Sequence, residues 1–331
     1  MKDLYDIVAE STKRVGQPLA LATLVHAEGS SYRRPGARML ICADGDTVGS
    51  VSGGCIEQEI AARARSVLES GEPLTIDFDT RRRFGCHGRI DIFVEKVPVG
   101  LLTEIANHLK ARRSCTIVTT PNGSHVQESS AGEAGSFPKA LDGEANPAFA
   151  PGYGAANSFL FSPFVQVVYP PLRLLVCGEG PDCAPMKKLC DVLGWECVVS
   201  GDAAALDLKL DTWTAAIVKS HNFGRDFAIL AKLLPLNLRY VGLIGPKKRR
   251  DQLLNDLLEI GVSINAGFFA PAGLDLNAET PEDIALSVVS EIQRVFGEAS
   301  GQSLRDRRLP IHRKANAAQS VSDIEWQKSA Q

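Results

Sequence analysis

Gly49-Ser50-Val51-Ser52-Gly53-Gly54-Cys55-Ile56-Glu57 is the stretch around which the rest of this sequence is organised. Two short strands are expected before it, over residues 37–42 and 47–50, and the Asp44-Gly45 pair between them is typical of a hairpin turn. After it, apolar residues recur at helical spacing up to Leu68, which predicts a helix. The stretch therefore predicts a strand, a glycine-rich turn and a helix in direct succession.

The predicted helix is expected to begin near Gly54, which gives the turn before it a specific chemistry. Ser52 is a candidate N-cap, and Glu57 falls early in the helix, where the dipole favours an acid. The Gly53-Gly54 pair carries no side chains, so the first free N–H groups are open to an anion. Cys55 is expected in the first turn, where these groups favour a thiolate and nearby glutamates oppose it. A functional anion or thiol site and a tight turn with a buried cysteine both fit these residues.

The composition is that of an ordinary globular protein. The chain has 331 residues, enough for two domains, with 44% hydrophobic and 23% charged residues. A net charge of -3 gives no reason to expect nucleic acid as a partner. The polar N-terminus and the lack of an apolar run of about 18 residues predict a cytoplasmic protein without a membrane partner. Eight cysteines without a C-x-x-C pair indicate reduced thiols rather than disulfides or structural zinc.

The fold class that these patterns predict is α/β, with two domains. Residues 1–123 are expected to form an α+β domain, with strands over 19–26, 37–42, 47–50, 74–79, 90–95 and 114–119 and helices near 4–16, 54–68 and 101–110. Residues 124–163 are rich in Gly, Ala, Ser, Glu and Pro, which predicts a flexible linker with a loose hairpin near its end.

A second domain is expected over residues 164–300, followed by a polar tail at 301–331. Its β-turn-α-β beginning, with strands over 173–177 and 195–199 around a helix at 184–193, predicts a Rossmann-like doubly wound fold. Further strands are expected at 215–219 and 240–244. Thr280-Pro281 is a strong helix start, and that helix is expected to continue to about Phe296.

The first turn of this second domain carries a modified dinucleotide fingerprint. Gly178 and Gly180 would let the chain turn tightly near a pyrophosphate, but Cys183 replaces the third glycine. Pro181 also removes one backbone donor. The acid that usually holds the ribose is replaced by Ser200, with Asp202 slightly later. A bound NAD therefore remains an open alternative, favoured over NADP because no arginine follows the strand.

Each of the other polar groups allows both a functional and a purely structural interpretation. His221-Asn222 ends a buried strand at the carboxyl edge, where it fits a ligand contact or a hydrogen-bonded loop anchor equally well. Arg38 forms a basic group with Arg33, Arg34 and 81–83, which is more typical of surface charge than of an anion site. The run 247–250 fits a solvated helix start or a phosphate contact.

Several of these runs resemble signatures of the XdhC/CoxI family. In the first domain the run 49–57 follows Gly29-Ser30-Ser31 and Pro35-Gly36-Ala37-Arg38-Met39. In the second domain the family typically carries G-A-G-H, T-H-N, Y-V-G-L-L-G-S-R-R-R and G-L-D-I-G-A-E-T-P-E-E-I-A runs. This chain has there Gly178-Glu179-Gly180-Pro181, Ser220-His221-Asn222, Tyr240-Val241-Gly242-Leu243-Ile244-Gly245-Pro246-Lys247-Lys248-Arg249 and Gly273-Leu274-Asp275-Leu276-Asn277-Ala278-Glu279-Thr280-Pro281-Glu282-Asp283. The resemblance covers both domains and leaves out little but the linker and the tail.

The resemblance implies an accessory chaperone rather than an enzyme. Family members serve molybdenum hydroxylases such as xanthine dehydrogenase and carbon monoxide dehydrogenase. They are understood to bind the molybdopterin form of the molybdenum cofactor transiently and hold it while a cysteine desulfurase-type sulfurase supplies the terminal sulfido ligand. They then deliver it to a xanthine dehydrogenase-type hydroxylase. Homodimers are common at this size, although no sequence feature demands one.

The same resemblance implies where the cofactor would bind. Ser52, Gly53, Gly54 and Cys55 are expected to line the cleft, with Cys86 and His87 opposite and the second domain closing over them. The further candidate cofactor-binding residues are Glu57, Arg38, Gly178, Gly180, His221 and Asn222. Three positions depart from the family pattern: its histidine at the nucleotide-type turn is Pro181, its strand-end acid is Ser200, and its C-G-G loop is Cys86-His87-Gly88.

Two alternative functions remain open on the sequence. One is an NAD-dependent oxidoreductase that uses the Rossmann-like domain with His221 as proton donor. The other is a ligand-free scaffold between the sulfurase and the hydroxylase. The altered fingerprint and the missing strand-end acid count against the first, and only an apolar segment near 159–168 and the polar tail support the second.

Overall fold

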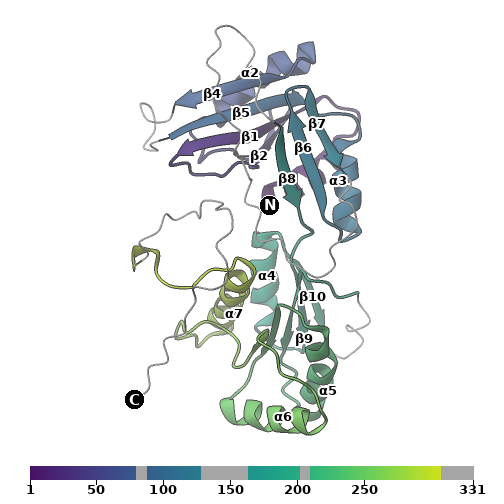
Figure 1. Cartoon of the computed structure of the whole chain (residues 1–331), viewed down its shortest axis with the longest axis vertical. Helices are drawn as coiled ribbons and strands as arrows, with labels where there is room; N and C mark the ends of the chain where they lie inside the picture. Colours follow the sequence, from purple (N-terminus) through teal and green to yellow (C-terminus); the bar gives the residue numbers. More distant parts are fainter. Residues whose placement is uncertain (80–87, 128–162, 202–208, 307–331) are drawn as a thin grey trace. The chain divides into compact units, whose positions relative to one another are not determined.

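The computed structural model describes residues 1–79, 88–127, 163–201 and 209–306 of the chain (Figure 1). These residues belong to two compact units, one built on Asp3–Tyr169 and the other on Pro170–Gln302. The first has antiparallel sheets and the second a parallel sheet with helices, so the predicted α/β class is confirmed. In this part of the chain no helix combines the length and the apolarity that crossing a bilayer requires.

The first unit contains a five-stranded antiparallel sheet with the order β3-β2-β1-β5-β4. Its central strand β1 is apolar on both faces because both faces are covered. Ala20 and Leu24 belong to one buried cluster with helix α2, while Leu19 and Leu21 belong to another with helices α1 and α3. The elements are α1 (Lys2–Lys13), β1 (Leu19–Gly29), β2 (Arg38–Cys42), β3 (Thr47–Gly49), α2 (Glu57–Ser70), β4 (Leu74–Asp79), β5 (Gly88–Lys96) and α3 (Leu101–Lys110).

A second, three-stranded sheet in this unit corrects the predicted domain boundaries. Its order is β7-β6-β8, from β6 (Cys115–Thr120), β7 (Gly123–Gln127) and β8 (Phe164–Val168). Residues 124–127, expected to begin the linker, therefore extend a hairpin, and 164–168, expected to begin the second domain, pair with β6. The reason is burial: Phe164 and Val168 are 5% and 0% exposed within cores of the first unit. The described residues end at 127 and resume at 163, so most of the predicted linker lies outside them.

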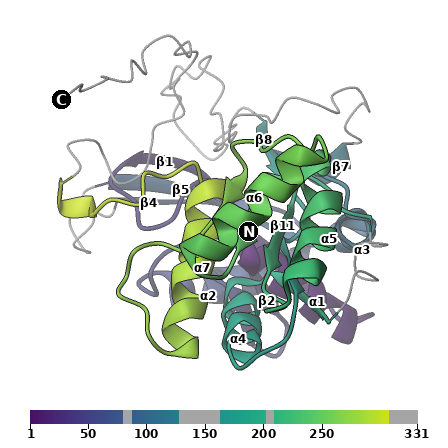
Figure 2. The same ribbon diagram turned by 90° about the horizontal axis from the view of Figure 1, so that it is seen from below.

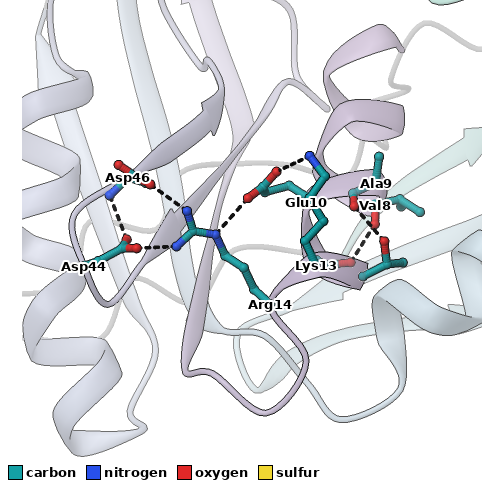
Figure 3. Close-up of polar contacts among 9 residues, drawn as sticks. Val8, Ala9, Glu10, Lys13, Arg14, Asp44 and Asp46 are labelled. Atoms are coloured by element: carbon teal, nitrogen blue, oxygen red, sulfur yellow. Dashed lines mark hydrogen bonds and ion pairs between the residues drawn. The ribbon is translucent and has the colours of Figure 1, made fainter.

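A salt-bridge cluster ties the end of α1 to the hairpin turn between β2 and β3 (Figure 3). The guanidinium of Arg14 donates to Glu10 (Nε–Oε1 2.8 Å), to Asp46 (Nη2–Oδ2 2.6 Å) and to Asp44. The backbone N–H of Asp46 also donates to the Asp44 side chain at 3.1 Å. These contacts fix the Asp44-Gly45 turn, which was predicted from the sequence, and hold in place the strand that leads into the signature stretch.

The second unit is a five-stranded parallel sheet with the order β10-β9-β11-β12-β13. Helices α4 and α7 pack on one face and α5 and α6 on the other (Figure 2). Strand β9 packs against both pairs of helices: Leu174 and Val176 belong to the cluster with α4 and α7, and Leu175 and Cys177 to the cluster with α5 and α6. The elements are β9 (Arg173–Cys177), α4 (Cys183–Leu193), β10 (Glu196–Ser200), β11 (Thr214–Val218), α5 (Phe223–Leu233), η2 (Leu234–Leu236), β12 (Tyr240–Leu243), α6 (Lys247–Glu259), β13 (Phe268–Phe269) and α7 (Pro281–Phe296). The short helix η3 (Leu304–Asp306) comes later in the chain and is grouped with the first unit.

Candidate functional site

The signature loop before α2 is held by one carboxylate. Glu57 accepts hydrogen bonds from the Ser52 N–H at 2.8 Å and the Ser52 Oγ at 2.7 Å, and from the Ile56 N–H at 3.2 Å. Partial burial raises the pKa of Glu57, but these hydrogen bonds outweigh it and bring the pKa below its usual value. Both ends of the loop are therefore pinned to the same side chain.

The predicted start of this helix is wrong by three residues. Helix α2 begins at Glu57 with Ile56 at the N-cap position and without a side-chain cap, so Ser52 is not the cap. Cys55 accordingly precedes the helix instead of lying in its first turn. The Glu57 carboxylate accepts the Ser52 and Ile56 N–H groups, and Ser52 Oγ accepts the Gly54 N–H at 3.3 Å, so these three N–H groups are not free in the way the sequence predicted. Gly53 and Gly54 remain candidate contacts, but as parts of a loop outside the helix.

The loop carries an exposed thiol, and an exposed aromatic ring lies over one of its glycines. Cys55 is exposed, unlike the other described cysteines, which are buried or half-buried. The ring of Tyr32, itself 68% exposed, lies over Gly53, because a Cβ added to that glycine would be 3.4 Å from the ring carbons. Arg33 joins the two loops by donating to Ser50 Oγ at 3.3 Å. No signal in the sequence distinguished Tyr32 from other surface aromatics.

Arg38 is buried in the first unit, contrary to its predicted place in a basic surface group. It is 2% exposed, and its guanidinium donates to the Gly36 carbonyl at 3.2 Å and to Gln166 Oε1. Burial lowers the pKa of Arg38 to about 10, with the negative charge of Glu95 opposing the shift. Because Gln166 belongs to β8, Arg38 joins the small sheet to the large one, and it is not available to a ligand from solvent.

Two predicted site residues, Cys86 and His87, lie outside the described residues, as do the arginines at 81–83 and Asp202. Within the described parts of the chain, no group of three or more His, Cys, Asp or Glu side chains is arranged to hold a metal ion. Among the described cysteines Cys55 is the exposed one, and it belongs to no such group there.

In the second unit, a buried lysine explains the Gly178 and Gly180 pair. A Cβ on Gly178 would lie 2.6 Å from the Lys219 backbone, and one on Gly180 would lie 3.0 Å from Lys219 Nζ. Lys219 is 1% exposed, is paired with Asp182, and lies 3.4 Å from the Cys183 sulfur. Both glycines have positive φ angles, 141° and 140°, which L-residues rarely adopt. The glycines are thus required by internal packing, whether or not a phosphate approaches them.

A second buried charge organises the loop after β11. Asp226 is 0% exposed; its carboxylate accepts from the Ser220 N–H at 3.0 Å and from the Ser220 hydroxyl, and pairs with Arg249. Arg249 belongs to the 247–250 run, so this member of the run is an internal ion-pair partner instead of a solvated helix start. Sequence reasoning named Ser220 only as part of the Ser220-His221-Asn222 run and did not single out Asp226.

These loops line a cleft of about 400 Å³ at the carboxyl end of the parallel sheet. His221 lines it from a left-handed backbone conformation with φ of 55°. Asn222 instead caps α5, its side chain accepting from the Arg225 N–H at 3.0 Å, which fits the loop-anchor reading. The residues around the cleft are Gly178, Glu179, Gly180, Gly201, Ser220, His221 and Arg225. Gly178, Gly180 and His221 were predicted as site residues, whereas Glu179, Gly201 and Arg225 were not.

Comparison with known protein families gives matches in both units. The model of the XdhC and CoxI family matches residues 13–79, and the model of the XdhC Rossmann domain matches residues 174–292. These ranges contain the signature loop and the cleft, and the second confirms the Rossmann-like prediction.

Similar individual proteins cover most of the chain. A Bacillus subtilis protein named as a probable xanthine dehydrogenase subunit is 27% identical, over 82% of this chain and 91% of the relative. The molybdenum cofactor insertion chaperone PaoD from Escherichia coli is 24% identical, over 85% of this chain and 84% of the relative. A crystal structure described as a xanthine dehydrogenase from Bacillus halodurans superposes with a TM-score of 0.71 at 26% identity, covering 92% of this chain and 98% of that one.

Proposed function

The chain belongs to the XdhC/CoxI family, and on that premise we propose that it is a chaperone for the molybdenum cofactor. It binds the molybdopterin form and protects it while a cysteine desulfurase-type sulfurase supplies the terminal sulfido ligand. It then assists insertion into a xanthine dehydrogenase-type hydroxylase. The names of the Bacillus subtilis and Escherichia coli relatives support this cargo and this class of client.

The observation that carries the proposal is the exposed thiol of Cys55 on a loop pinned by Glu57. A soft thiolate suits a molybdenum–sulfur centre better than it suits Mg²⁺ or Ca²⁺. The exposed ring of Tyr32 beside it offers a flat surface on which a pterin ring can stack. Because Gly53 has no side chain, the ring can lie directly over the loop that carries the thiol.

The shape of this site fits cargo better than a resident metal ion. Among the described residues Cys55 does not belong to any group of three or more side chains that could hold a metal ion, so a bare ion would lack a full coordination set. A cofactor that brings its own dithiolene ligands needs only one further contact to the metal, with the rest of its binding energy coming from the organic part. Cys86 and His87 remain proposed contacts of the same cargo.

Retention of the cofactor by cysteine variants tests this proposal. Wild-type protein is incubated with molybdenum cofactor released from a hydroxylase, desalted, and analysed for molybdenum and for absorbance. We expect stoichiometric retention, reduced about tenfold or more in Cys55→Ala, which corresponds to about 1.4 kcal/mol. Cys197→Ala, at a half-buried thiol of the second unit, is the matched control and should retain the cofactor like wild type.

Two further arms separate the parts of the proposal. Transfer is measured by adding loaded protein to an apo-hydroxylase and following its activity, with free cofactor as reference. Unchanged retention in Cys55→Ala, Cys86→Ala and the double variant would remove the thiols from the mechanism. No retention by the wild type would reject the chaperone function itself.

A further inference from the structure

The parallel sheet of the second unit reverses its winding direction between β9 and β11. Its order, β10-β9-β11-β12-β13, places the second strand along the chain on one side of the first and the third strand on the other. In open α/β sheets, ligands bind at this reversal, outside the carboxyl ends of the strands. The cleft of about 400 Å³ lies there, since it is lined by residues that follow β9, β10 and β11.

Glu179 supplies a carboxylate at the place where a strand-end acid is missing. In nucleotide-binding folds of this kind, an acid at the end of the second strand holds the ribose hydroxyls. Here β10 ends at Ser200 and is followed by Gly201. A Cβ added to Gly201 would lie 2.6 Å from Glu179 Oε1, so the Glu179 carboxylate occupies the space that a side chain at 201 would fill. Glu179 therefore reaches from the first turn to the end of the second strand.

The cleft also presents polar side chains that have no partner among the described residues. Arg225 and His221 line it together with Glu179, and these three side chains make no hydrogen bond or ion pair with other described residues. The buried charges behind them are already neutralised, Lys219 by Asp182 and Arg249 by Asp226. The cleft thus combines one available carboxylate with one available guanidinium and an imidazole.

We propose that this cleft binds a ribonucleoside 5′-phosphate, free or as one half of a dinucleotide. The Glu179 carboxylate accepts hydrogen bonds from the two ribose hydroxyls, and Arg225 with His221 contacts the phosphate. The volume lies near the lower end of that of small-molecule sites, which suits a mononucleotide. Binding at this site is independent of the proposed chaperone function, because it is measured with the nucleotide alone.

Calorimetric titration of the full chain with AMP, 2′-deoxy-AMP and adenosine tests both contacts. We expect AMP to bind, and the deoxy compound to bind about tenfold more weakly because a charge-assisted hydrogen bond is lost. In Glu179→Ala the ratio of the two affinities should fall to near one. Wild-type protein should bind AMP more tightly than adenosine, and in Arg225→Met this preference should fall, with His221 left as the remaining phosphate contact. Exposed helical positions on α2 supply matched controls, Glu69→Ala and Arg65→Met, in which both ratios should stay at the wild-type values.

Variants of two glycines, Gly201 and Gly224, test whether the position of the Glu179 carboxylate matters for binding, and not only its presence. Gly201→Ala adds a methyl group where Glu179 now lies, so it should weaken the binding of AMP more than that of 2′-deoxy-AMP, which has only one hydroxyl to lose contact with the carboxylate. Gly224→Ala is the control, because the added methyl group would have its nearest neighbour at 3.7 Å, an ordinary contact distance. Tighter binding of NAD than of AMP would identify the dinucleotide form, and the reverse order the mononucleotide. Equal affinity for AMP and its deoxy form in the wild type, or no binding of either AMP or NAD, would overturn the proposal.

Discussion

At the scale of single residues, the signature loop depends on Glu57, which accepts hydrogen bonds from Ser52 at one end and Ile56 at the other. Replacing it by glutamine removes one acceptor and the charge. We expect Glu57→Gln to lower the free energy of unfolding at pH 7 by about 1–2 kcal/mol. Chemical denaturation with urea measures the difference, and Glu69→Gln, an exposed glutamate of the same helix, should leave it unchanged.

The same contact predicts a pH dependence. Because the folded-state pKa of Glu57 lies below its usual value, the carboxylate stabilises the fold above the unfolded pKa, about 4.3, and this contribution is lost as pH falls through the folded value. The difference in stability between wild type and Glu57→Gln should therefore shrink between pH 7 and about pH 3. A difference that stays constant over this range would show that the charge of Glu57 is not what holds the loop.

The buried pair of Lys219 and Asp182 leads to a second prediction at this scale. Asp182→Asn leaves the lysine, 1% exposed, without its counter-charge. We expect a loss of about 3 kcal/mol in the free energy of unfolding, since an uncompensated buried charge is costly. Adding Lys219→Met to the variant should recover much of this loss. Asp191→Asn, at an exposed position of α4, is the control, and a loss below about 1 kcal/mol in Asp182→Asn would contradict the argument.

At the scale of elements, helix α7 shows the strongest match between sequence and structure. The sequence predicted a helix start at Thr280-Pro281, and the structure has a full capping box there, in which Thr280 Oγ1 accepts from the Asp283 N–H and Asp283 accepts from the Thr280 N–H. We expect Thr280→Ala to cost about 1 kcal/mol of stability. Thr280→Ser keeps the hydroxyl and should lose much less, so equal losses in the two variants would refute a capping role.

Elements with strong local signals were predictable from the sequence, and elements fixed by tertiary contacts were not. The bounds of α3 and β9 match their predicted ranges because periodicity and apolar runs define them. Strand β8 was assigned to the wrong domain because its partner β6 lies more than 40 residues earlier in the chain, which no local pattern shows. The start of α2 was misplaced because Glu57, and not Ser52, satisfies the backbone there.

For the candidate sites, too, local motifs were predictable from the sequence and tertiary contacts were not. The glycines at 178 and 180 and the exposed Cys55 could be singled out from motifs, but their surroundings could not. Lys219 fills the space below the glycines, and Glu179 extends over Gly201; both placements depend on strands that meet only in the folded sheet. Arg38 was misjudged because a buried arginine and a surface arginine look alike in sequence.

At the scale of the whole molecule, each compact unit has hydrophobic clusters of its own. In the first unit they centre on β1 and in the second on β9. A domain with its own core can in principle fold alone, so we expect each of the two compact units to unfold cooperatively and independently of the other. Trp195 and Trp213 both belong to the second unit, which makes tryptophan fluorescence a reporter of that unit once Trp326, outside the described residues, is replaced by phenylalanine.

Hydrogen exchange followed by mass spectrometry tests this independence in the full chain. Glu57→Gln should speed exchange in peptides from β1, β2 and α2 by about 5- to 30-fold, the factor that corresponds to 1–2 kcal/mol, and leave peptides from β9–β12 unchanged. Asp182→Asn should do the reverse and also shift the fluorescence transition. Binding of AMP to the cleft should slow exchange only in the second set of peptides, those from β9–β12. Matching changes in both sets for either variant would mean that the two cores unfold as one cooperative unit, so that stability measured anywhere in the chain reports on both sites.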